Sequence, residues 1–256
     1  MPSRNSRRDF LERATLLAAI VLSSAAPLTA QETPEHLLAR AIDSAGGAAR
    51  LAAARAFEWQ ATAVVHVPGR DIHIRGSWRV QPPDSAVVAT YITADGPSSM
   101  RRVILAGRRG WLQGNGTTTV MTNAVLTEER HQFYLYSLLR LVPLRDAGVT
   151  LLAASSDSAG HPGIVVRRPG HPEVTLFFGA NARVVGLRTI FAISATAGTE
   201  AQVIALDGTM TASDIRWFQR MTITRDGHPY YEMTLTSLQA MARLDDPLLA
   251  GPGADQ

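Results

Sequence analysis

The amino-acid sequence predicts an α+β fold that is mainly β and forms a single domain. Three observations lead to this prediction. Residues 34–45 have the apolar spacing of a helix, the pattern changes from residue 57 onward to the alternation of β-strands, and Gly, Pro and Asn divide that region into about 11 or 12 short strands. A helical segment interrupts the strands in mid-chain. Short strands joined by tight turns are typical of an antiparallel sheet.

The first predicted element is a helix that begins after Thr33. Thr33 suits the N-cap, Pro34 fits the first turn, and Glu35 complements the positive end of the helix dipole. Its apolar stripe consists of Leu37, Leu38, Ala41 and Ile42. The pair Gly46-Gly47 ends this helix, and a short alanine-rich helix over residues 48–55 follows.

A run of about six strands comes next. In residues 57–67 one face carries Phe57, Trp59, Ala61, Ala63 and Val65. Residues 71–80 alternate in the same way after the turn at Pro68-Gly69, and Pro82-Pro83-Asp84 ends that strand. Asn115-Gly116 predicts a tight hairpin. The remaining strands of this run are expected at residues 85–93, 100–107, 110–114 and 117–122.

A helical insert is expected from Thr127-Glu128-Glu129 up to Pro143, with Phe133, Leu135, Leu138, Leu139 and Val142 as its apolar side chains. Strands then resume at residues 149–155, 163–168, 173–179, 183–192, 201–208, 216–226 and 230–241. The polar tail, residues 243–256, is expected to be flexible.

Residues 1–30 have the composition of an export signal. A basic start precedes an apolar run from Leu16 to about Ala26, and small residues lead to Ala30. The pair Arg7-Arg8, followed by Phe10 and Leu11, matches the twin-arginine motif, although an ordinary secretory signal with paired arginines is the alternative. Either signal predicts a periplasmic or secreted protein. No later segment has the roughly 20 apolar residues that a membrane span requires, so we expect none in the mature chain.

Composition excludes several classes of function. The chain has 0 cysteines, which rules out disulfides, thiol catalysis and cysteine-bound zinc. All 25 basic residues are arginines, yet in residues 31–256 they are nearly balanced by acidic residues. The charge therefore does not predict nucleic-acid binding.

The tripeptide Gly-His-Pro occurs three times, around His161, His171 and His228. One strand separates His161 from His171, so about 20 Å lies between them and they cannot share a metal ion. We interpret each copy as a turn in which glycine supplies a positive φ and proline ends the strand ladder. Glu128 and His131 have the spacing of a metal half-site, but a role at the start of the helix is the better interpretation. No catalytic or cofactor-binding motif is present, and we predict neither a metal nor a cofactor.

Large apolar side chains on the strands and the insert are the main candidates for a ligand site. They either fill an ordinary core or line an apolar cavity under a strongly curved sheet. These candidates are Trp59, Trp78, Trp111, Phe133, Leu138, Phe178, Trp217, Met221 and Met233. The arginine doublets Arg101-Arg102 and Arg167-Arg168 either protect strand edges or bind anionic groups at a cavity rim.

The order of elements resembles the lipoprotein-carrier superfamily, the LolA/LolB-like fold. Residues 76–84, "GSWRVQPPD", and residues 105–113, "LAGRRGWLQ", are similar to two of its segments. The resemblance implies an unclosed β-barrel over residues 31–242, covered by the N-terminal helix and a mid-chain helical lid, with an apolar cavity for acyl chains. The chain departs from the family in its twin-arginine-like signal and in lacking the cysteine that its outer-membrane receptor needs.

These observations favour a periplasmic protein without enzymatic activity that binds an acyl lipid or lipoprotein and shields the acyl chains. A membrane-associated protein is a second candidate partner. The first alternative is a periplasmic sensor or protein-interaction module of the same fold. An exported hydrolase is the second alternative. An open apolar cavity favours the lipid-binding function, whereas a filled barrel with an exposed apolar patch favours the interaction module.

Overall fold

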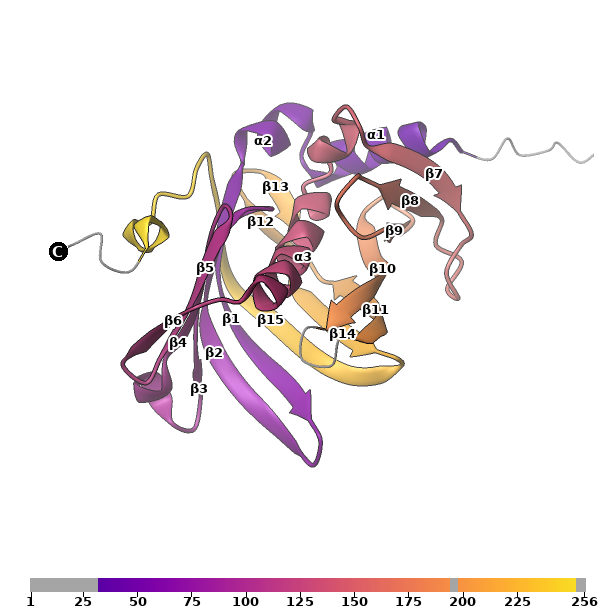
Figure 1. Ribbon diagram of the computed structural model, residues 1–256. Coiled ribbons are helices and arrows are strands. Elements are labelled where there is room, and N and C mark those ends of the chain that lie inside the picture. Colours follow the sequence, from indigo (N-terminus) through magenta and orange to yellow (C-terminus); the bar gives the residue numbers. More distant parts are fainter. Residues whose placement is uncertain (1–31, 194–197, 252–256) are drawn as a thin grey trace, which may run out of the picture. The chain divides into compact units, whose positions relative to one another are not determined.

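The protein is built around one antiparallel sheet of 13 strands. The structure, a computed structural model, describes residues 32–193 and 198–251 (Figure 1). The first half of this range contains α1 (Pro34–Ala45), α2 (Ala48–Ala53), β1 (Ala56–Val67), β2 (Arg70–Gln81), β3 (Ser85–Ile92), the short 3-10 helix η1 (Gly96–Ser99), β4 (Arg101–Ala106), β5 (Arg109–Gly114), β6 (Thr117–Val120) and α3 (Asn123–Leu139).

The second half contains η2 (Val142–Arg145), β7 (Thr150–Ala154), β8 (Gly163–Arg167), β9 (Val174–Phe178), β10 (Val184–Ile193), β11 (Gly198–Asp207), β12 (Met210–Ala212), β13 (Ile215–Trp217), β14 (Arg220–Arg225), β15 (His228–Met241) and η3 (Pro247–Ala250). The strand order of the large sheet is β6-β5-β4-β3-β2-β1-β15-β14-β11-β10-β9-β8-β7. The first strand therefore pairs with the last, and this pairing joins the two halves of the chain.

The sheet curves strongly but does not close, because β6 and β7 remain its two edges in the described part of the chain. This confirms the predicted fold class, a mainly-β α+β fold with an unclosed barrel. The sheet has 13 strands, slightly more than the 11 or 12 expected. A separate two-stranded sheet consists of β12 and β13.

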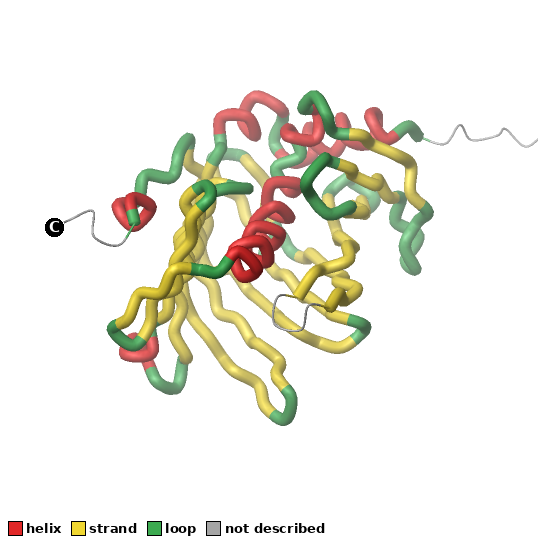
Figure 2. Tube along the Cα trace, viewed as in Figure 1, coloured by secondary structure: helices red, strands yellow, loops and turns green. Residues whose placement is uncertain are grey.

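Alternation along the strands divides the sheet into an inner, concave face and an outer face. On β1, Phe57, Trp59, Ala61 and Ala63 are buried on the inner face, as the sequence predicts. α3 crosses this concave face between the two halves of the sheet (Figure 2). Its C-terminal half carries Phe133, Leu135, Leu138 and Leu139 into the core. The core of the protein therefore lies between α3, α1 and the inner face.

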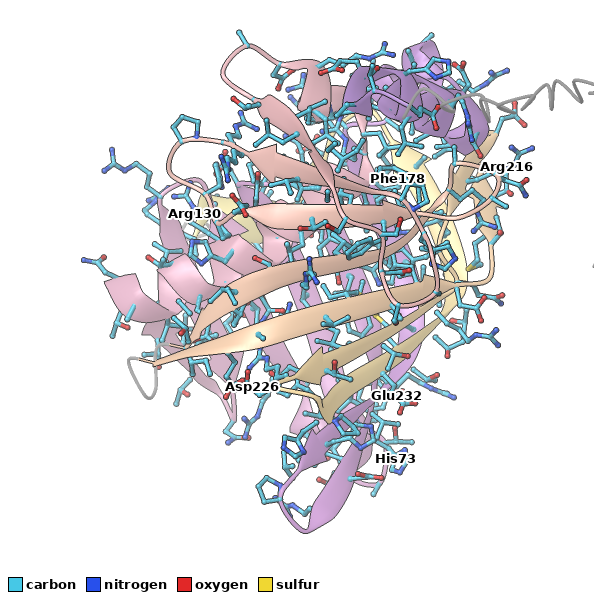
Figure 3. All side chains as sticks on the ribbon, turned by 90° about the vertical axis from the view of Figure 1, so that its right-hand side faces the viewer. His73, Arg130, Phe178, Arg216, Asp226 and Glu232 are labelled. Atoms are coloured by element: carbon cyan, nitrogen blue, oxygen red, sulfur yellow. The ribbon has the colours of Figure 1, made fainter. Side chains whose placement is uncertain are left out.

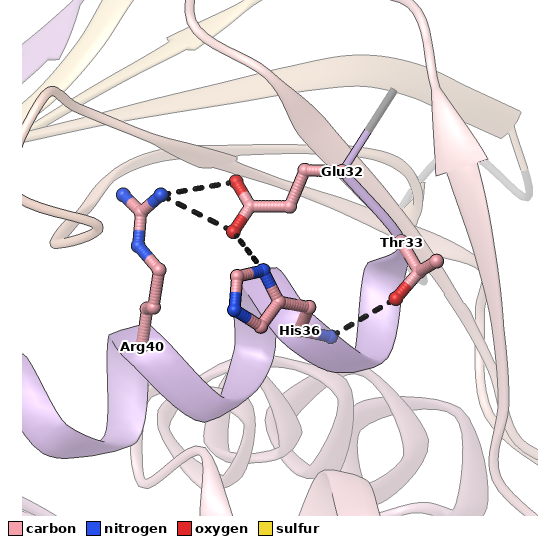
Figure 4. Close-up of polar contacts among 4 residues, drawn as sticks. All are labelled: Glu32, Thr33, His36 and Arg40. Carbon is pink, nitrogen blue, oxygen red and sulfur yellow. Dashed lines mark hydrogen bonds and ion pairs between the residues drawn. The ribbon is translucent and has the colours of Figure 1, made fainter. Parts of the chain in front are cut away.

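α1 begins where the sequence predicts. The Oγ1 of Thr33 accepts a hydrogen bond from the backbone N–H of His36, which caps the helix. The carboxylate of Glu32 pairs with the His36 ring at 2.7 Å and with Arg40 at 3.2 Å (Figure 4). These contacts hold the residue before the N-cap against the first two turns of α1. Gly46 ends the helix with φ 128°, and a Cβ at this position would lie 2.5 Å from the carbonyl oxygen of Asp214. A side chain at residue 46 would therefore separate α1 from the β12–β13 hairpin.

α3 begins at Asn123, four residues before the predicted start. The Oγ1 of Thr122 accepts a hydrogen bond from the N–H of Val125 and provides the cap. Thr127 and Glu128 therefore lie inside the helix, and the prediction that Glu128 and His131 serve at the helix start is wrong. None of the described helices has both the length and the apolar content needed to cross a bilayer.

Residues 216–226, predicted as one strand, form two. The chain turns at Ser213-Asp214, both with positive φ, so β13 pairs back onto β12. The N–H of Gln219 then donates to the carbonyl of Asp207, and β14 enters the large sheet beside β11. The change of partner at Phe218-Gln219 breaks the strand, and the continuous apolar alternation conceals this break.

The described part of the predicted flexible tail packs on the outer face of the sheet. Leu244 and Asp246 are buried, and Asp246 forms an ion pair with Arg79 of β2. Leu248 and Leu249 of η3 contact a small apolar cluster of Val87, Ile104 and Trp111. Residues 244–250 therefore contact the sheet, and Leu248 and Leu249 help to cover the second apolar cluster.

The glycine of each Gly-His-Pro copy lies in a turn, as predicted, but Pro229 of the third copy lies inside β15, opposite Thr224, and does not end the ladder. Gly160, Gly170 and Gly227 have φ of 82°, 78° and 80°, in the left-handed region that favours glycine. The first copy precedes β8, the second follows it, and the third begins β15.

Candidate functional site: an apolar cavity beneath α3

A cavity of about 210 Å³ lies between α3 and the inner face of the sheet, toward the β1–β2 hairpin. Trp78, Val88, Phe133 and Ile223 are buried and form its floor. The other lining residues are half-buried and form its rim: Val65, Ile74, Thr90, Val103, Glu129, Gln132, Tyr136, Tyr230 and Tyr231. The cavity is therefore apolar at depth and reached by solvent at its rim.

Simple periodicity brings these residues together. Ile74 and Trp78 are four apart on β2, so both side chains project to the inner face. On α3, Glu129, Gln132, Phe133 and Tyr136 follow the i, i+3, i+4, i+7 spacing, which places them on one side of the helix. Six strands and one helix face thus converge on a single space.

Stacked aromatic rings hold the floor in place. The rings of Trp59 and Trp78 lie 6.4 Å apart and nearly parallel on adjacent strands. Tyr136 of α3 approaches Trp59 at 5.2 Å and Phe133 at 6.2 Å. The indole N–H of Trp59 is buried without a hydrogen-bond partner in the described structure. Since aromatic contacts of this kind add about 1 kcal/mol each, they link α3 to the sheet directly above the cavity.

The rim carries one carboxyl group, that of Glu129. Burial, together with the smaller effect of the nearby charge of Glu128, raises the pKa of Glu129 to about 7. Burial also raises the pKa values of Tyr136 and Tyr231, so both phenols stay neutral. The hydroxyl of Tyr231 donates to the sulfur of Met233 at 3.7 Å. The cavity wall therefore combines apolar rings with a few neutral hydrogen-bonding groups and one carboxyl group.

Contacts on the other side of α3 fix the helix over the sheet. Tyr134 stacks on His171 with ring centroids 4.0 Å apart, and Arg130 pairs with Asp84 at 2.8 Å. Burial lowers the pKa of His171, and the charge of Arg168 adds to this effect. His171 is consequently neutral at neutral pH and stacks as an uncharged ring. These contacts attach α3 to the β2–β3 turn through Asp84 and to the β8–β9 loop through His171.

Apart from Trp111, the predicted cavity residues fall into three groups. Trp78 and Phe133 line the cavity, and Trp59 lies directly behind Trp78. Met221 lines a much smaller adjoining space of about 20 Å³. The other core residues among the predictions are Leu138, Phe178, Trp217 and Met233.

Two of the core residues lie far from the cavity. Trp217 stacks on Phe57 at 4.5 Å and borders a 40 Å³ space beside α1. Phe178 of β9 lies toward the opposite end of the sheet from Glu232, which marks the hairpin end (Figure 3). Both residues pack the core and do not border the 210 Å³ cavity.

Trp111, also predicted as a cavity residue, does not line the 210 Å³ cavity. Trp111 projects from β5 to the outer face, where it packs against Val87, Ile104 and η3. Val103, the neighbour of Ile104, occupies the inner face in its place and lines the cavity. Alternation predicts that a strand has two faces, but not which of them the C-terminal segment covers.

None of the four predicted rim arginines lines the cavity. Arg101 shares the inner face of β4 with Val103 but packs over Gly114 of β5. Arg102 projects to the outer face, and Arg167 pairs with Glu173 on the surface. Arg168 lies close enough to Tyr134 and His171 to affect both pKa values.

The sequence analysis missed most of the rim. Glu129, Gln132 and Tyr136 of α3 were not predicted, nor were Tyr230 and Tyr231 of β15. The signal for the α3 residues was present: Thr122 caps the helix, and the spacing of residues 129, 132, 133 and 136 then defines one face. For β15 no comparable signal exists, because Tyr230 and Tyr231 are neighbours and only the local register places both at the rim.

Among the described residues, no group of three or more His, Asp or Glu side chains could hold a metal ion. The predicted signal residues Arg7, Arg8, Phe10 and Leu11 lie outside the described residues. The polar groups of α3 and β15 at the cavity therefore act as individual side chains and not as a metal-binding cluster.

Solved structures share this fold at low sequence identity. A LolA superfamily protein from Nitrosomonas europaea superposes with a TM-score of 0.55 at 10% identity, covering 85% of this chain and 97% of that one. A domain described as a candidate outer membrane lipoprotein-sorting protein from Vibrio parahaemolyticus gives 0.53 at 9% identity, with 83% and 95% covered. A DUF1329 family protein from Desulfovibrio piger gives 0.51 at 8% identity, with 85% and 97% covered. No protein-family profile and no curated protein sequence matches the chain. The similarity is therefore one of fold.

Proposed function

We propose that this protein is an exported, periplasmic protein that binds the acyl chains of a lipid or lipoprotein in the cavity beneath α3. The observation that carries the proposal is the cavity itself, an apolar space of about 210 Å³ whose floor is Trp78, Val88, Phe133 and Ile223. An apolar cavity of about 150 Å³ already accepts benzene. Each buried methylene contributes about 0.8 kcal/mol, so a chain segment in this space gains several kcal/mol.

The shared fold supports the same function. Two of the similar structures are described by their names as a LolA superfamily protein and a candidate lipoprotein-sorting domain. The export signal expected in residues 1–30 agrees with a periplasmic site of action. The sequence left open whether the barrel is filled or open, and an open apolar cavity favours the binding protein over an interaction module.

α3 acts as the lid in this proposal. Gln132, Tyr136 and Ile223 border both the main cavity and the 20 Å³ space beside Met221. A movement of Tyr136 would join the two spaces and lengthen the cavity for a longer chain. The N-terminal half of α3 is half-buried, whereas its C-terminal half is in the core, so the N-terminal half is the part that can lift.

Native mass spectrometry of the gently purified mature protein, followed by organic extraction, tests the proposal. We expect an acyl lipid in near-stoichiometric amount. A Val103→Trp variant fills the cavity from the inner face of β4 and should lose this lipid. Val203→Trp is the matched control, because Val203 is 44% exposed on the outer face of β11, and it should keep the lipid. A protein free of lipid that also ignores added fatty acids and monoacylglycerols would refute the proposal.

A further inference from the structure

The residues that line the cavity include an acidic side chain but no basic one. Of the 13 residues that line the cavity, Glu129 is the only one that can carry a charge near neutral pH. No arginine lines it, although the chain contains 25. Proteins bind carboxylate and phosphate groups most often through arginine, whose planar fork of donors matches them. The described wall therefore lacks the group that an anionic lipid head would need.

Glu129 has no hydrogen-bond or ion-pair partner among the described residues. Its neighbour Arg130 lies on the other side of α3, paired with Asp84. Arg225, which stacks on the Tyr230 ring, is held between the rings of Phe191 and Tyr230 at 4.5 and 3.6 Å. The carboxyl group of Glu129 thus faces the cavity unpaired.

Gln132 lies one helical turn from Glu129 on the same face of α3 and also lines the cavity. An amide both donates and accepts hydrogen bonds, whereas an ionised carboxylate only accepts. Together they form a short polar strip on an otherwise apolar wall. A bound molecule with its chain on the floor would bring its polar end to this strip.

We propose that Glu129, with Gln132 beside it, selects acyl ligands by their head group: it accepts a hydrogen bond from a head that carries no negative charge, such as a hydroxyl or an amine, and it excludes anionic heads. This inference rests on the proposed function, and it adds the chemical class of the ligand. Free fatty acids and other anionic lipids are then poor ligands, and monoacylglycerol-like or amine-bearing lipids are good ones.

The groups around Glu129 determine how the selection depends on pH. Burial and, to a smaller extent, the charge of Glu128 on the same helix raise the pKa of Glu129. From the sheet, Tyr230 and Tyr231 of β15 and Thr90 of β3 face the cavity, and all three are neutral. Glu129 is therefore largely ionised above pH 7 and largely protonated below it. Exclusion of anionic heads should be strong at pH 8 and weak at pH 6.

The test uses three ligands with the same chain: laurate, its monoacylglycerol and dodecylamine, each below its micelle concentration. Binding to the mature protein is measured by intrinsic tryptophan fluorescence and by calorimetry at pH 6 and pH 8. At pH 8 we expect the monoacylglycerol and the amine to bind about tenfold more tightly than laurate, a difference typical of one nearby like charge. The affinity for laurate should rise on going to pH 6.

Two variants and one control test whether the charge of Glu129 causes the head-group selection. Glu129→Gln should raise laurate affinity at pH 8 to within about twofold of the monoacylglycerol, while Gln132→Glu should widen the gap further. Glu35→Gln removes the same charge from an exposed position on α1 and should change nothing. If all three ligands bind equally at both pH values in every variant, the selection by Glu129 is wrong and the acyl-binding function stands. If none of them binds the wild-type protein, the proposed function itself fails.

Discussion

Replacing Glu129 with glutamine should stabilise the protein without ligand, by an amount that depends on pH. The pKa of this carboxyl group rises from 4.5 to about 7 on folding. Each tenfold change in a protonation equilibrium corresponds to about 1.4 kcal/mol, so the full change corresponds to about 3 kcal/mol. Water at the half-buried rim solvates part of the charge, and we therefore expect about 2 to 3 kcal/mol in practice.

The sign follows from linkage. Because the folded protein holds this proton more tightly than the unfolded chain, the free energy of unfolding falls as the pH rises from 4.5 to about 7 and then levels off. Glutamine cannot ionise and so avoids the loss. Glu129→Gln should therefore be nearly neutral at pH 4.5 and more stable than wild type by about 2 to 3 kcal/mol at pH 8.

Urea unfolding followed by tryptophan fluorescence at a series of pH values measures this difference. The Glu35→Gln variant serves as control, since Glu35 is exposed and its removal should leave the pH profile unchanged. A stability difference between Glu129→Gln and wild type that is the same at pH 4.5 and pH 8 would refute the reasoning. Such a result would mean that the carboxyl group finds a partner or full hydration in the folded protein.

Three further predictions concern the frame around the cavity. Asp246→Ala should lower the free energy of unfolding by about 2 to 3 kcal/mol, because it leaves the partner of a buried ion pair unpaired, whereas Asp245→Ala, at an exposed position, should have little effect in the same urea assay. His66 bonds two carboxylates, mainly that of Asp71, and these contacts raise the pKa of His66. The stabilising effect of His66 should therefore be complete below pH 6.5 and lost as the pH rises. A His66→Gln variant that is equally destabilised at pH 5.5 and pH 9 would contradict this prediction. Gly76→Ala should destabilise by about 3 kcal/mol or more, since the new Cβ would lie 2.2 Å from a backbone oxygen of β3, and a thermal unfolding midpoint equal to that of wild type would count against this packing.

The fold was largely predictable because each strand carries its own signal. Apolar and polar residues alternate in β1 and β2, and the turn residues between them have the expected positive φ, as at Gly69. These signals are local, so they hold whatever the rest of the chain does. The partner of each strand is not local: nothing in the sequence of β1 indicates that it pairs with β15, whose partner residues lie 166 or more positions away. The resemblance to a known family supplied that part of the fold.

The cavity was less predictable, for a physical reason. Trp78 lines it and Trp59 does not, yet both lie on the inner face of adjacent strands and stack on one another. Whether a face is filled depends on the volume that α3 leaves above it, and this volume depends on where the helix begins. The prediction of a start at Thr127 placed Glu129 in the first turn, where acidic residues are ordinary. With the observed cap at Thr122, Glu129 lies in the second turn and faces the cavity.

The position of Glu129 is costly for folding, and this cost is itself an argument for a binding role. Leucine or methionine at residue 129 would fit the apolar side of α3 and remove a burial penalty of about 2 to 3 kcal/mol. On the inner face Gln202 accepts a hydrogen bond from Arg225 and the hydroxyl of Thr189 donates to a backbone carbonyl, whereas the indole N–H of Trp59 is buried without a partner in the described structure. An unpaired carboxyl group at the rim of a cavity departs from the usual pairing of buried polar groups. Local departures of this kind are typical of binding sites, where a ligand supplies the missing partner. A head group that donates a hydrogen bond to Glu129 would recover part of the penalty on binding, and that recovery would make the affinity depend on the head group as well as on the chain.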